Sequence, residues 1–399
     1  MKILLINSWY YPNMRGGAEQ STKALAEQLY KNGHDVAVLS ADGLTANVTT
    51  EMISRIVVYR CKTYLTNDYN TFVKKIIRKR NDIKYTKVIK DLKYVINMFH
   101  PEVIHTNSLS GFSFYIWKYF YIRKIPIIHT LRDYSLFSPK GLYERRGDVS
   151  IFYWLFLKWY YKANMHYAKY ISYITAPSDF TLSTICALGF FEGIPGQIVP
   201  NAIEYNMEDT KEYIKERCSR KSSHKYIMFA GRLLKFKGIN LLLEAFEMLD
   251  NENYRLVICG EGECEQSVLN KIEHDPRIIY KGQLSKERLE ENYKKADIVV
   301  FPSLWDEPFG RIIIEANKFG VPVITTNRGG IPEIINTLGG GIILSEETAE
   351  VLATTIDKML NSDISLYCLN ILKNLHYYSI RYQADEFEKI YNRLAGENK

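Results

Sequence analysis

The stretch that decides the fold is Ser303-Leu304-Trp305-Asp306-Glu307-Pro308-Phe309-Gly310-Arg311-Ile312-Ile313-Ile314-Glu315-Ala316. Before it, the apolar run Asp297 to Pro302 ends in a proline and predicts a short strand. Within and beyond it, Arg311 to Phe319 predicts a helix that is closed by Gly320, with Pro322 as a stop signal. A strand, a loop rich in helix breakers and a helix form the unit of an open α/β sheet, where ligands bind beyond the carboxyl ends of the strands.

Two glutamates of this stretch are spaced to contact different parts of one ligand. Glu307 lies in the loop before the predicted helix, and Glu315 lies more than a turn inside it. Eight steps at the helical rise span at most about 12 Å, the scale of a sugar–diphosphate–ribose ligand rather than a single phosphate. The amides of Phe309, Gly310 and Arg311 begin the helix, lack intrahelical acceptors and can therefore face an anion. Two glutamates alone would be ordinary solvated residues, whereas Glu-Pro-Phe-Gly between a strand and a helix favours a binding site.

The run Glu-Pro-Phe-Gly-Arg-Ile-Ile-Ile-Glu-Ala closely resembles the signature of the family 4 glycosyltransferases. Members of that family have the GT-B fold, an α/β fold of two Rossmann-like doubly wound domains that face each other across a cleft. They are retaining enzymes that use nucleotide-sugar donors. The resemblance implies that Glu307 holds hydroxyls of the transferred sugar and that Glu315 holds the ribose of the donor.

Composition is that of a two-domain globular enzyme. The chain has 399 residues, too many for one core, with 46% hydrophobic and 24% charged residues. Its six cysteines are scattered, which favours free thiols in a cytoplasm over a disulfide scaffold or a metal site. Met1 leads directly into an apolar strand, so no signal peptide is expected. The longest apolar run, Val149 to Leu157, is too short to span a bilayer, and we expect a soluble or peripheral cytoplasmic protein.

The domain boundary is expected near residue 200, where Val199 to Glu204 is followed by a charged run. We expect residues 1–200 to form an N-terminal acceptor-binding domain and residues 201–381 a C-terminal nucleotide-sugar-binding domain. The resemblance further implies that the last helix, within 382–399, packs back on the first domain.

A glycine loop follows the first predicted strand, Lys2 to Asn7. Strand, Gly16-Gly17 and helix together make a turn that can bind phosphate, a weak signal when taken alone. The family has Gly-Gly-x-Glu in this place, facing the donor phosphates and the acceptor. The resemblance therefore assigns Gly16 and Gly17 to the donor and Glu19 to the acceptor.

Polar residues also end the strands Val103 to Thr106 and Pro126 to Leu131. Asn107 follows the first of these strands, and Arg132 and Asp133 follow the second. Family members commonly carry a donor-contacting histidine where this chain has Arg132. Arginine keeps its proton and can clamp phosphate but cannot act as a base. Two alternatives stay open: Arg132 binds the donor, or His129 does the work of that histidine, although a strand histidine is more often a core residue. Asn107, His129 and Asp133 are the candidate acceptor residues of this region.

The second half repeats the strand–helix alternation and carries further donor residues. The glycine-bounded loop Gly231 to Gly238 follows a predicted strand and holds three basic residues. Cations at a strand end suit a diphosphate leaving group. The resemblance assigns Arg232 and Lys237 to that diphosphate and the segment Ile278 to Leu284, with Gln283 and Leu284, to the nucleobase. No Asp-x-Asp occurs in the chain, so we expect Arg232, Lys237 and helix amides to replace a metal ion, with no cofactor required.

The acceptor half is unusually basic and aromatic. Residues 60–99 hold eleven basic and three acidic residues, a net +8 that exceeds the +7 of the whole chain. Residues 112–124 and 143–170 are crowded with aromatic residues interspersed with lysine and arginine. This mixture suits the surface of an anionic membrane and a lipid-linked or growing cell-surface saccharide as acceptor. The alternative is that the aromatic residues simply form the core of two helices.

Three rival functions deserve comparison with glycosyl transfer. A nucleotide-sugar epimerase or hydrolase of the same fold would need further carboxylates around the sugar, and the sequence indicates none. A non-catalytic partner subunit would fit the arginine at position 132, but the intact Glu307, Glu315, Arg232 and Lys237 argue against it. Nucleic-acid binding is suggested only by the basic segment, and no RNA-binding signature accompanies it.

Overall fold

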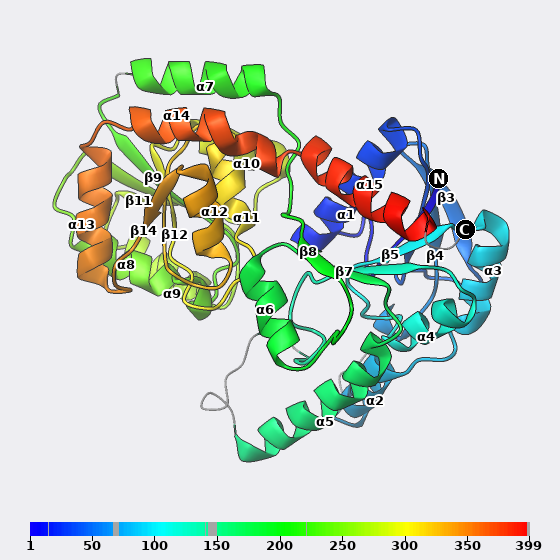
Figure 1. Cartoon of the computed structure of the whole chain (residues 1–399). Coiled ribbons are helices and arrows are strands. Elements are labelled where there is room, and N and C mark those ends of the chain that lie inside the picture. The colour runs from blue at the N-terminus through cyan, green and yellow to red at the C-terminus, as the bar shows by residue number, and fades with distance from the viewer. Residues whose placement is uncertain (15, 67–71, 140, 143–149, 221, 397–399) are drawn as a thin grey trace. The chain divides into compact units, whose positions relative to one another are not determined.

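The computed structural model describes residues 1–14, 16–66, 72–139, 141–142, 150–220 and 222–396. It divides into two compact units, Met1–Ala202 with Ile380–Lys399, and Ile203–Ser379. Each unit is a parallel sheet covered by helices, shown in Figure 1.

The first unit is built on an eight-stranded sheet in the order β3-β4-β2-β1-β5-β6-β7-β8. Every neighbouring pair is parallel except β3 with β4. The central strands are buried on both faces, as runs of apolar residues in parallel sheets require. The strands are β1 Lys2–Asn7, β2 Asp35–Ser40, β3 Thr49–Ile53, β4 Ile56–Arg60, β5 Val103–Thr106, β6 Ile127–Thr130, β7 Tyr173–Ala176 and β8 Gly196–Ile198.

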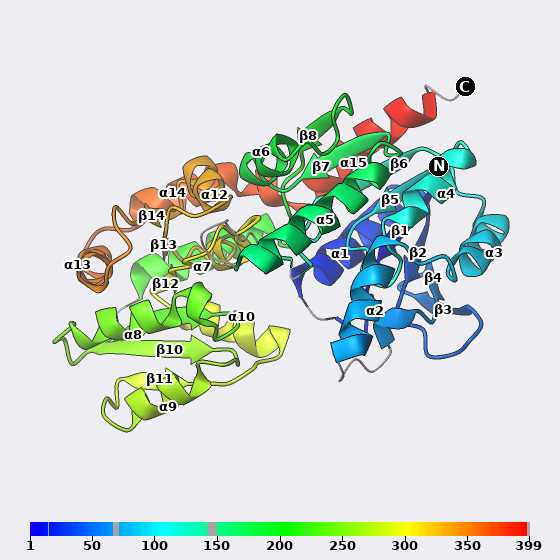
Figure 2. The ribbon, with the colours of Figure 1, turned by 90° about the horizontal axis from the view of Figure 1, so that it is seen from below.

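The helices of the first unit alternate with these strands. They are α1 Gly17–Lys31, α2 Phe72–Ile83, α3 Ile89–Phe99, α4 Tyr115–Ile122, α5 Ile151–Ala168 and α6 Asp179–Ala187, with the short η1 Tyr64–Thr66. The α6 helix begins where the Ser178 side chain accepts a hydrogen bond from the Thr181 amide. Figure 2 shows α5 lying along this unit beside α4.

The last helix, α15 Ile380–Gly396, belongs to the first unit and packs against α1 and β5. Its buried face includes Phe387 and Tyr391. The Tyr391 hydroxyl is 2.6 Å from Nδ1 of the buried His105, whose Nε2 is 2.7 Å from the Thr130 hydroxyl. Polar groups inside the core therefore set the position of α15 on the sheet.

The second unit is a six-stranded, fully parallel sheet in the order β11-β10-β9-β12-β13-β14. Its strands are β9 Lys225–Ala230, β10 Tyr254–Cys259, β11 Ile278–Tyr280, β12 Ile298–Phe301, β13 Val323–Thr325 and β14 Gly341–Ile343. Its helices are α7 Met207–Ser219, α8 Ile239–Glu247, α9 Glu265–Ile272, α10 Lys286–Lys295, α11 Arg311–Asn317, α12 Ile331–Leu338, α13 Ala349–Leu360 and α14 Ser365–Asn374, with η3 Lys235–Lys237 and η4 Leu375–Tyr378. Apolar cores fill both faces of this sheet.

Strand order places a ligand-binding point in each unit. In the second unit the chain runs outward from β9 through β10 to β11 and then returns to β12, which pairs with the other edge of β9. In the first unit the same reversal separates β1 from β5. The loops after the two central strands diverge at such a switch point, and open α/β sheets bind their ligands there.

The structure corrects part of the membrane-surface prediction. The aromatic residues at 112–120 are largely core, because Phe112, Trp117 and Phe120 are all fully buried and Tyr119 is nearly so. In α5, by contrast, Phe152 and Trp159 are 82% and 55% exposed. Residues 143–149 and the side chains at 72–76 and 79, which carry part of the predicted basic charge, lie outside the described residues.

Candidate functional site

Glu307 is a buried carboxylate at the switch point of the second unit. It lies in the loop after β12 and is 6% exposed. Its Oε1 accepts hydrogen bonds from Ser303 Oγ at 2.9 Å, from Trp305 Nε1 at 2.7 Å and from the ammonium group of Lys237. Three donors on one oxygen compensate for the loss of water around the buried charge. Ser303 and Trp305 are site residues that the sequence interpretation missed, although both stand within four positions of Glu307.

Lys237 comes from the loop after β9 and is held by aromatic rings as well as by Glu307. Its Nζ lies 5.3 Å from the ring centroid of Trp305 and 5.8 Å from that of Phe301, within reach of cation–π attraction. Gly238 follows with φ +76°, and a Cβ there would lie 1.8 Å from the carbonyl oxygen of Pro302. Only glycine permits this contact, which brings the loops after β9 and β12 together.

The backbone of Glu307 is supported by the loop after β13. Its carbonyl oxygen accepts from the Gly330 amide at 2.8 Å. Gly329 has φ +57°, and a Cβ there would lie 2.2 Å from the same carbonyl oxygen. Three strands that are neighbours in the sheet, β9, β12 and β13, are therefore followed by loops that position the Glu307 carboxylate.

Glu315 lies on α11 and forms an ion pair with Arg311 one turn earlier, at 2.7 Å between Arg311 Nε and Glu315 Oε1. Its side chain is 24% exposed, so the carboxylate can reach a ligand. The neighbouring Tyr293 hydroxyl is buried, and burial first and the Glu315 charge second raise the pKa of Tyr293 well above its usual value. Tyr293 is therefore a neutral neighbour of Glu315.

The start of α11 combines a buried ring with an unusual backbone. Gly310 is the residue before the helix and has φ +114°, a conformation that favours glycine. Phe309 is buried, and its ring centroid is 6.0 Å from that of Tyr378 in the core. The predicted role of the Phe309, Gly310 and Arg311 amides toward an anion stays a prediction.

Other predicted donor residues of the second unit lie on neighbouring loops. Arg232 follows β9, is exposed, and has no ion-pair partner among the described residues. Gln283 and Leu284 lie between β11 and α10, and Gln283 is exposed. The Gly260 amide donates to the Gly282 carbonyl at 2.7 Å, which joins this loop to the loop after β10.

In the first unit Arg132 links three segments at the carboxyl edge of the sheet. Its Nε donates to Asn107 Oδ1 at 2.9 Å, and its Nη1 donates to Asn201 Oδ1. Asn107 itself is 1% exposed. The structure thus brings the predicted Arg132 and Asn107 together and adds Asn201, which lies 69 positions away along the chain and carried no local signal.

His129, the alternative to Arg132 that the sequence left open, is a core residue. It is 4% exposed, its Nδ1 is 3.0 Å from the Thr106 hydroxyl, and its ring meets the Trp117 ring edge-on at 4.9 Å. Burial lowers the pKa of His129 to about 3, so the ring is neutral at physiological pH. We therefore withdraw His129 from the predicted acceptor residues.

The remaining predicted residues of the first unit lie at loop and helix starts. Gly16 and Gly17 are exposed, and α1 begins at Gly17. Glu19 is buried in the first turn of α1, and its Oε2 would lie 3.7 Å from a Cβ on Gly16. Asp133 accepts from the Ser135 amide at 2.9 Å, and burial raises the pKa of its carboxyl group.

Sequence models of two families match consecutive parts of the chain. The model described as Glycosyltransferase Family 4 matches residues 15–206. The model described as Glycosyl transferases group 1 matches residues 210–378. The stretch that contains Glu307 and Glu315 lies in the second of these matches.

Curated relatives and solved structures agree with these matches. An uncharacterized 42.6 kDa protein in the cps region of Klebsiella pneumoniae is 28% identical over 321 residues, 79% of this chain and 82% of the relative. An uncharacterized glycosyltransferase of Methanocaldococcus jannaschii is 24% identical over 376 residues, 90% of this chain and 89% of the relative.

Among solved structures, the sucrose-phosphate synthase of Thermosynechococcus elongatus superposes with a TM-score of 0.75 at 17% identity and covers 99% of both chains. An Anabaena protein, HepE in complex with UDP and glucose, superposes with a TM-score of 0.68 at 16% identity, over 98% of this chain and 99% of that one. With both family models matched and these neighbours sharing its fold, the chain belongs to the family 4, group 1 glycosyltransferases and has the GT-B fold.

Proposed function

We propose that this glycosyltransferase moves a hexose, with retention of anomeric configuration, from a nucleotide diphosphate sugar to a hydroxyl group of a saccharide acceptor. The observation that carries the proposal is the Glu307–Lys237 pair at the switch point of the second unit. A carboxylate that can accept from sugar hydroxyls stands directly beside a cation that can accompany a diphosphate. An epimerase or hydrolase would require further carboxylates that protonate the sugar, and the sequence indicates none beyond the family glutamates.

One carboxylate oxygen of Glu307 is hydrogen-bonded within the protein, and the other is proposed to bind the nucleotide sugar. Oε1 holds its three protein donors, and no described residue hydrogen-bonds to Oε2. Because the three donors restrain the carboxylate, Oε2 is preorganised toward a sugar hydroxyl group. Preorganised acceptors contribute most when the sugar must be held as charge develops on it.

Lys237 and Arg232 are proposed to stabilise the departing diphosphate. As the bond between the anomeric carbon and the phosphate oxygen breaks, negative charge grows on the diphosphate, and two cations lower the energy of that state. The acceptor oxygen forms its bond on the same face of the sugar, and its proton passes to the departing phosphate oxygen. The two cations would then take the place of a metal ion, so the proposal includes no metal requirement.

Glu315 is proposed to accept hydrogen bonds from the ribose hydroxyl groups of the nucleotide. Its ion pair with Arg311 engages Oε1 and orients the carboxylate. The HepE neighbour was solved with UDP and glucose, which makes UDP-hexoses the first donors to test for this chain. The Klebsiella relative lies in a cps region, which favours a cell-surface saccharide as acceptor.

The first test is a thermal-shift panel of UDP-, GDP- and ADP-hexoses with the purified chain. A stabilising nucleotide sugar identifies the donor, and the E315A variant should lose that stabilisation. If the nucleotide sugars that stabilise the wild type stabilised E315A equally, the nucleotide would bind elsewhere and the assignment of Glu315 would be overturned.

A lipid-linked acceptor and peripheral contact with an anionic membrane complete the proposal, and α5 carries this part. Ile151, Phe152, Leu155 and Trp159 are each at least 55% exposed and lie along one side of the helix. Lys158 and Lys162 are exposed on the same side. The opposite side, with Leu157 and Tyr160, is buried.

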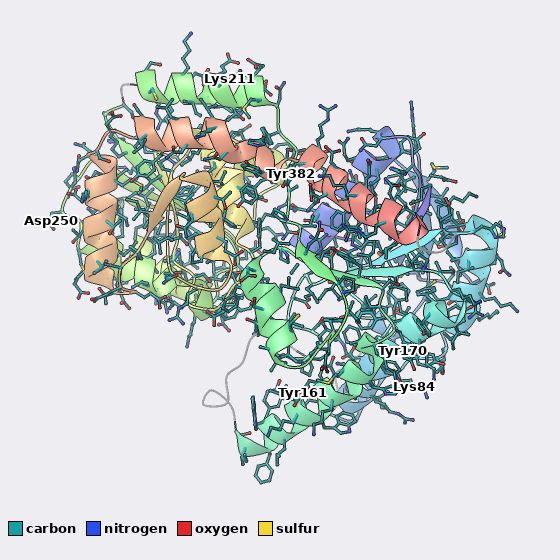
Figure 3. The ribbon with its side chains drawn as sticks, in the orientation of Figure 1. Lys84, Tyr161, Tyr170, Lys211, Asp250 and Tyr382 are labelled. Atoms are coloured by element: carbon teal, nitrogen blue, oxygen red, sulfur yellow. The ribbon has the colours of Figure 1, made fainter. Side chains whose placement is uncertain are left out.

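The neighbourhood of α5 extends this mixture of rings and cations. Beyond the carboxyl end of α5, the ring centroids of Tyr170 and Tyr121 are 5.2 Å apart. Tyr121 is 57% exposed at the end of α4. Figure 3 labels Tyr161 on this helix, Tyr170 just beyond its end and Lys84 near that end. None of the described helices has the length and apolar composition that crossing a bilayer requires. An exposed apolar face flanked by lysines suits a helix that lies in the plane of a membrane surface.

A further inference from the structure

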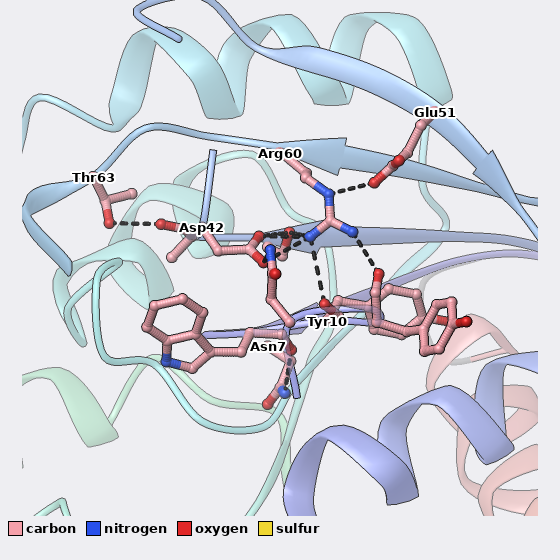
Figure 4. Close-up of polar contacts among 11 residues, drawn as sticks. Asn7, Tyr10, Asp42, Glu51, Arg60 and Thr63 are labelled. Atoms are coloured by element: carbon pink, nitrogen blue, oxygen red, sulfur yellow. Dashed lines mark hydrogen bonds and ion pairs between the residues drawn. The ribbon is translucent and has the colours of Figure 1, made fainter. Parts of the chain in front are cut away.

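A buried ion pair joins the carboxyl ends of β2 and β4 in the first unit. Arg60, the last residue of β4, is 8% exposed, and Asp42, two residues beyond β2, is 2% exposed. Arg60 Nη1 donates to both oxygens of Asp42, at 2.8 and 2.7 Å (Figure 4). The Ser40 hydroxyl donates to the same carboxylate at 2.6 Å. A buried pair is tolerated only when such additional hydrogen bonds satisfy its atoms.

The rest of this network reaches the loop after β1. Arg60 Nη2 donates to the carbonyl oxygen of Tyr11, and Nη1 lies 3.5 Å from that of Tyr10. Asn13 Nδ2 donates to Asp42 Oδ2 at 2.9 Å. Arg60 thus binds two carbonyl groups of the Tyr10–Asn13 turn, and Asp42 binds the side chain of Asn13, the last residue of the turn. Within the turn, the backbone amide of Asn13 donates a hydrogen bond to the Tyr10 carbonyl oxygen at 2.9 Å.

Each of the three guanidinium nitrogens of Arg60 donates to a partner within the protein. Its Nε donates to Glu51, and its two terminal nitrogens donate to Asp42, Tyr10 and Tyr11 (Figure 4). Asp42 likewise accepts from Arg60, Ser40 and Asn13. The pair is therefore placed to act on the loop rather than on a bound molecule.

The position of the turn gives this network a functional consequence. The loop after β1 leaves the sheet at the switch point between β1 and β5, and α1 begins at Gly17, four residues beyond Asn13. We propose that Arg60 and Asp42 are positioning residues that, by holding the Tyr10–Asn13 turn, set the Gly16–Gly17 loop for sugar transfer. The inference rests on the proposed function, because it takes that loop as part of the transfer site.

The sharpest variant is Asn13→Asp. It keeps the size of the side chain but replaces the amide that donates to Asp42 with a second carboxylate, so the turn is repelled from its anchor. Asn13 is exposed, so the core is untouched. The matched control is Asn47→Asp, the same change at an exposed position of the next loop. Arg60→Lys is a second variant, which keeps the buried charge but loses the fork that reaches two carbonyl groups.

Two measurements decide the inference, with UDP-glucose, GDP-mannose and ADP-glucose as donor probes. Hydrogen exchange of the backbone amides of residues 10, 11, 13 and 14 reports the turn, and hydrolysis of the donor probe reports transfer. We expect Asn13→Asp to speed the exchange at least about tenfold and to lower kcat at least about tenfold, as misplacement of a loop near the chemistry does. Affinity for the free nucleoside and the unfolding temperature should match Asn47→Asp, because the residues proposed for the ribose and the nucleobase lie in Ile203–Ser379.

Each other outcome contradicts the inference. Unchanged exchange in Asn13→Asp would show that the network does not hold the turn. Faster exchange with unchanged kcat would show that the turn does not position the transfer site, and so would full activity in a folded Arg60→Lys. A fall in kcat matched by a fall in unfolding temperature would reduce the pair to a structural role. If wild-type protein binds no nucleotide sugar, the proposed function fails, and the exchange measurement still decides whether the pair holds the turn.

Discussion

Glu307 shows how one residue can be both buried and available. A carboxylate that is 6% exposed is destabilised unless it is hydrogen-bonded, and here a lysine, a serine and a tryptophan all donate to the same oxygen. The asymmetry between its two oxygens leaves Oε2 as a restrained acceptor, which we propose binds the sugar. Lys237 is shared between this carboxylate and two aromatic rings, so its charge is also held in place.

Glu307→Gln should lower kcat at least about 100-fold while changing the donor Kd little, because the acceptor acts mainly as charge develops in the transition state. The variant keeps the shape of the side chain but removes the charge that pairs with Lys237. Steady-state kinetics with the donor identified in the panel gives both constants. A raised KM with an unchanged kcat would mean that Glu307 binds the ground state only.

Glu315→Ala should weaken the donor about 10- to 100-fold, since hydrogen bonds to a charged group are worth about 1.5–3 kcal/mol. The matched control is Glu290→Ala, which removes a glutamate of α10 that is ion-paired with Lys318 in the same unit. Titration calorimetry compares the two variants. Equal affinities would remove Glu315 from the nucleotide site.

His129 predicts a pH dependence of stability. Burial lowers its pKa to about 3, so between that value and the unfolded pKa of 6.5 the unfolded chain binds the proton and the folded chain does not. The contribution of the neutral His129 to the free energy of unfolding is complete above pH 6.5. It decreases as the pH falls and is lower by about 2 kcal/mol at pH 5. Denaturant unfolding across a pH series should show a shallower decline for His129→Leu than for wild type. An identical decline would contradict the buried neutral state, and exposed His376→Ala serves as the control that should not alter it.

At the scale of elements, the strand–loop–helix around Glu307 was predictable because its signals are local. A continuous apolar run marks a strand buried on both faces, and proline and glycine mark the loop and the helix end. The predicted strand within 297–302 is observed as Ile298–Phe301, and the helix predicted over 311–319 is observed as Arg311–Asn317. Burial of parallel strands leaves little freedom in such assignments.

Contacts between distant segments could not be predicted from one sequence. One partner of Arg132 is Asn201, and one partner of Arg60 is Asp42, just beyond the neighbouring strand β2. Neither pair has a characteristic spacing, because sheet order rather than sequence distance brings them together. His129 was ambiguous for the related reason that a strand position does not reveal which groups surround it.

The aromatic helices show the same limit for composition. Both α4 and α5 are rich in rings, but most of the α4 aromatic side chains are buried while Phe152 and Trp159 of α5 are exposed. Aromatic content predicts large apolar surface and does not say whether the protein or a membrane covers it. Only the packing of each helix against its neighbours separates the two cases.

The exposed face of α5 should bind anionic vesicles. Each basic residue near an anionic surface contributes about 1 kcal/mol, and buried apolar side chains add to this. We expect co-sedimentation with phosphatidylglycerol vesicles that falls with added salt, and much weaker co-sedimentation with phosphatidylcholine vesicles. The double variant F152S/W159S should lose binding. The matched control L366S/L369S, which removes two exposed leucines from α14, should keep it. Protein that stays in the supernatant with anionic vesicles at low salt would contradict the membrane proposal.

At the scale of the whole molecule, two sheets of similar topology divide the work. The strand order of each unit reverses once, and the Gly16–Gly17 loop, Lys237 and Glu307 follow strands at those reversals. The second unit offers carboxylates and cations suited to a nucleotide sugar, and the first offers the glycine loop, Arg132 and the exposed α5. The last helix, α15, returns the chain to the first unit and is anchored there by His105.

Transfer should continue in the presence of EDTA, because Lys237 and Arg232 are proposed to neutralise the diphosphate. Arg232→Ala and Lys237→Ala should each lower kcat by about 100-fold or more, as removal of a preorganised charge does elsewhere. The assay is donor turnover with EDTA and then with added Mg²⁺ or Mn²⁺. Activity that disappears with the chelator and returns with the metal ion would overturn the metal-independent mechanism.

The most direct test of glycosyl transfer with retention is the anomeric proton signal in NMR spectra, recorded as wild-type protein and Glu307→Gln each hydrolyse the nucleotide hexose identified in the panel. Water takes the place of the acceptor, so the test does not depend on knowing it. The account predicts that wild type first releases the sugar with the anomeric configuration of the donor, before mutarotation, and that Glu307→Gln releases it at least about 100-fold more slowly. First release of the opposite anomer, or equal rates in the two proteins, would contradict it.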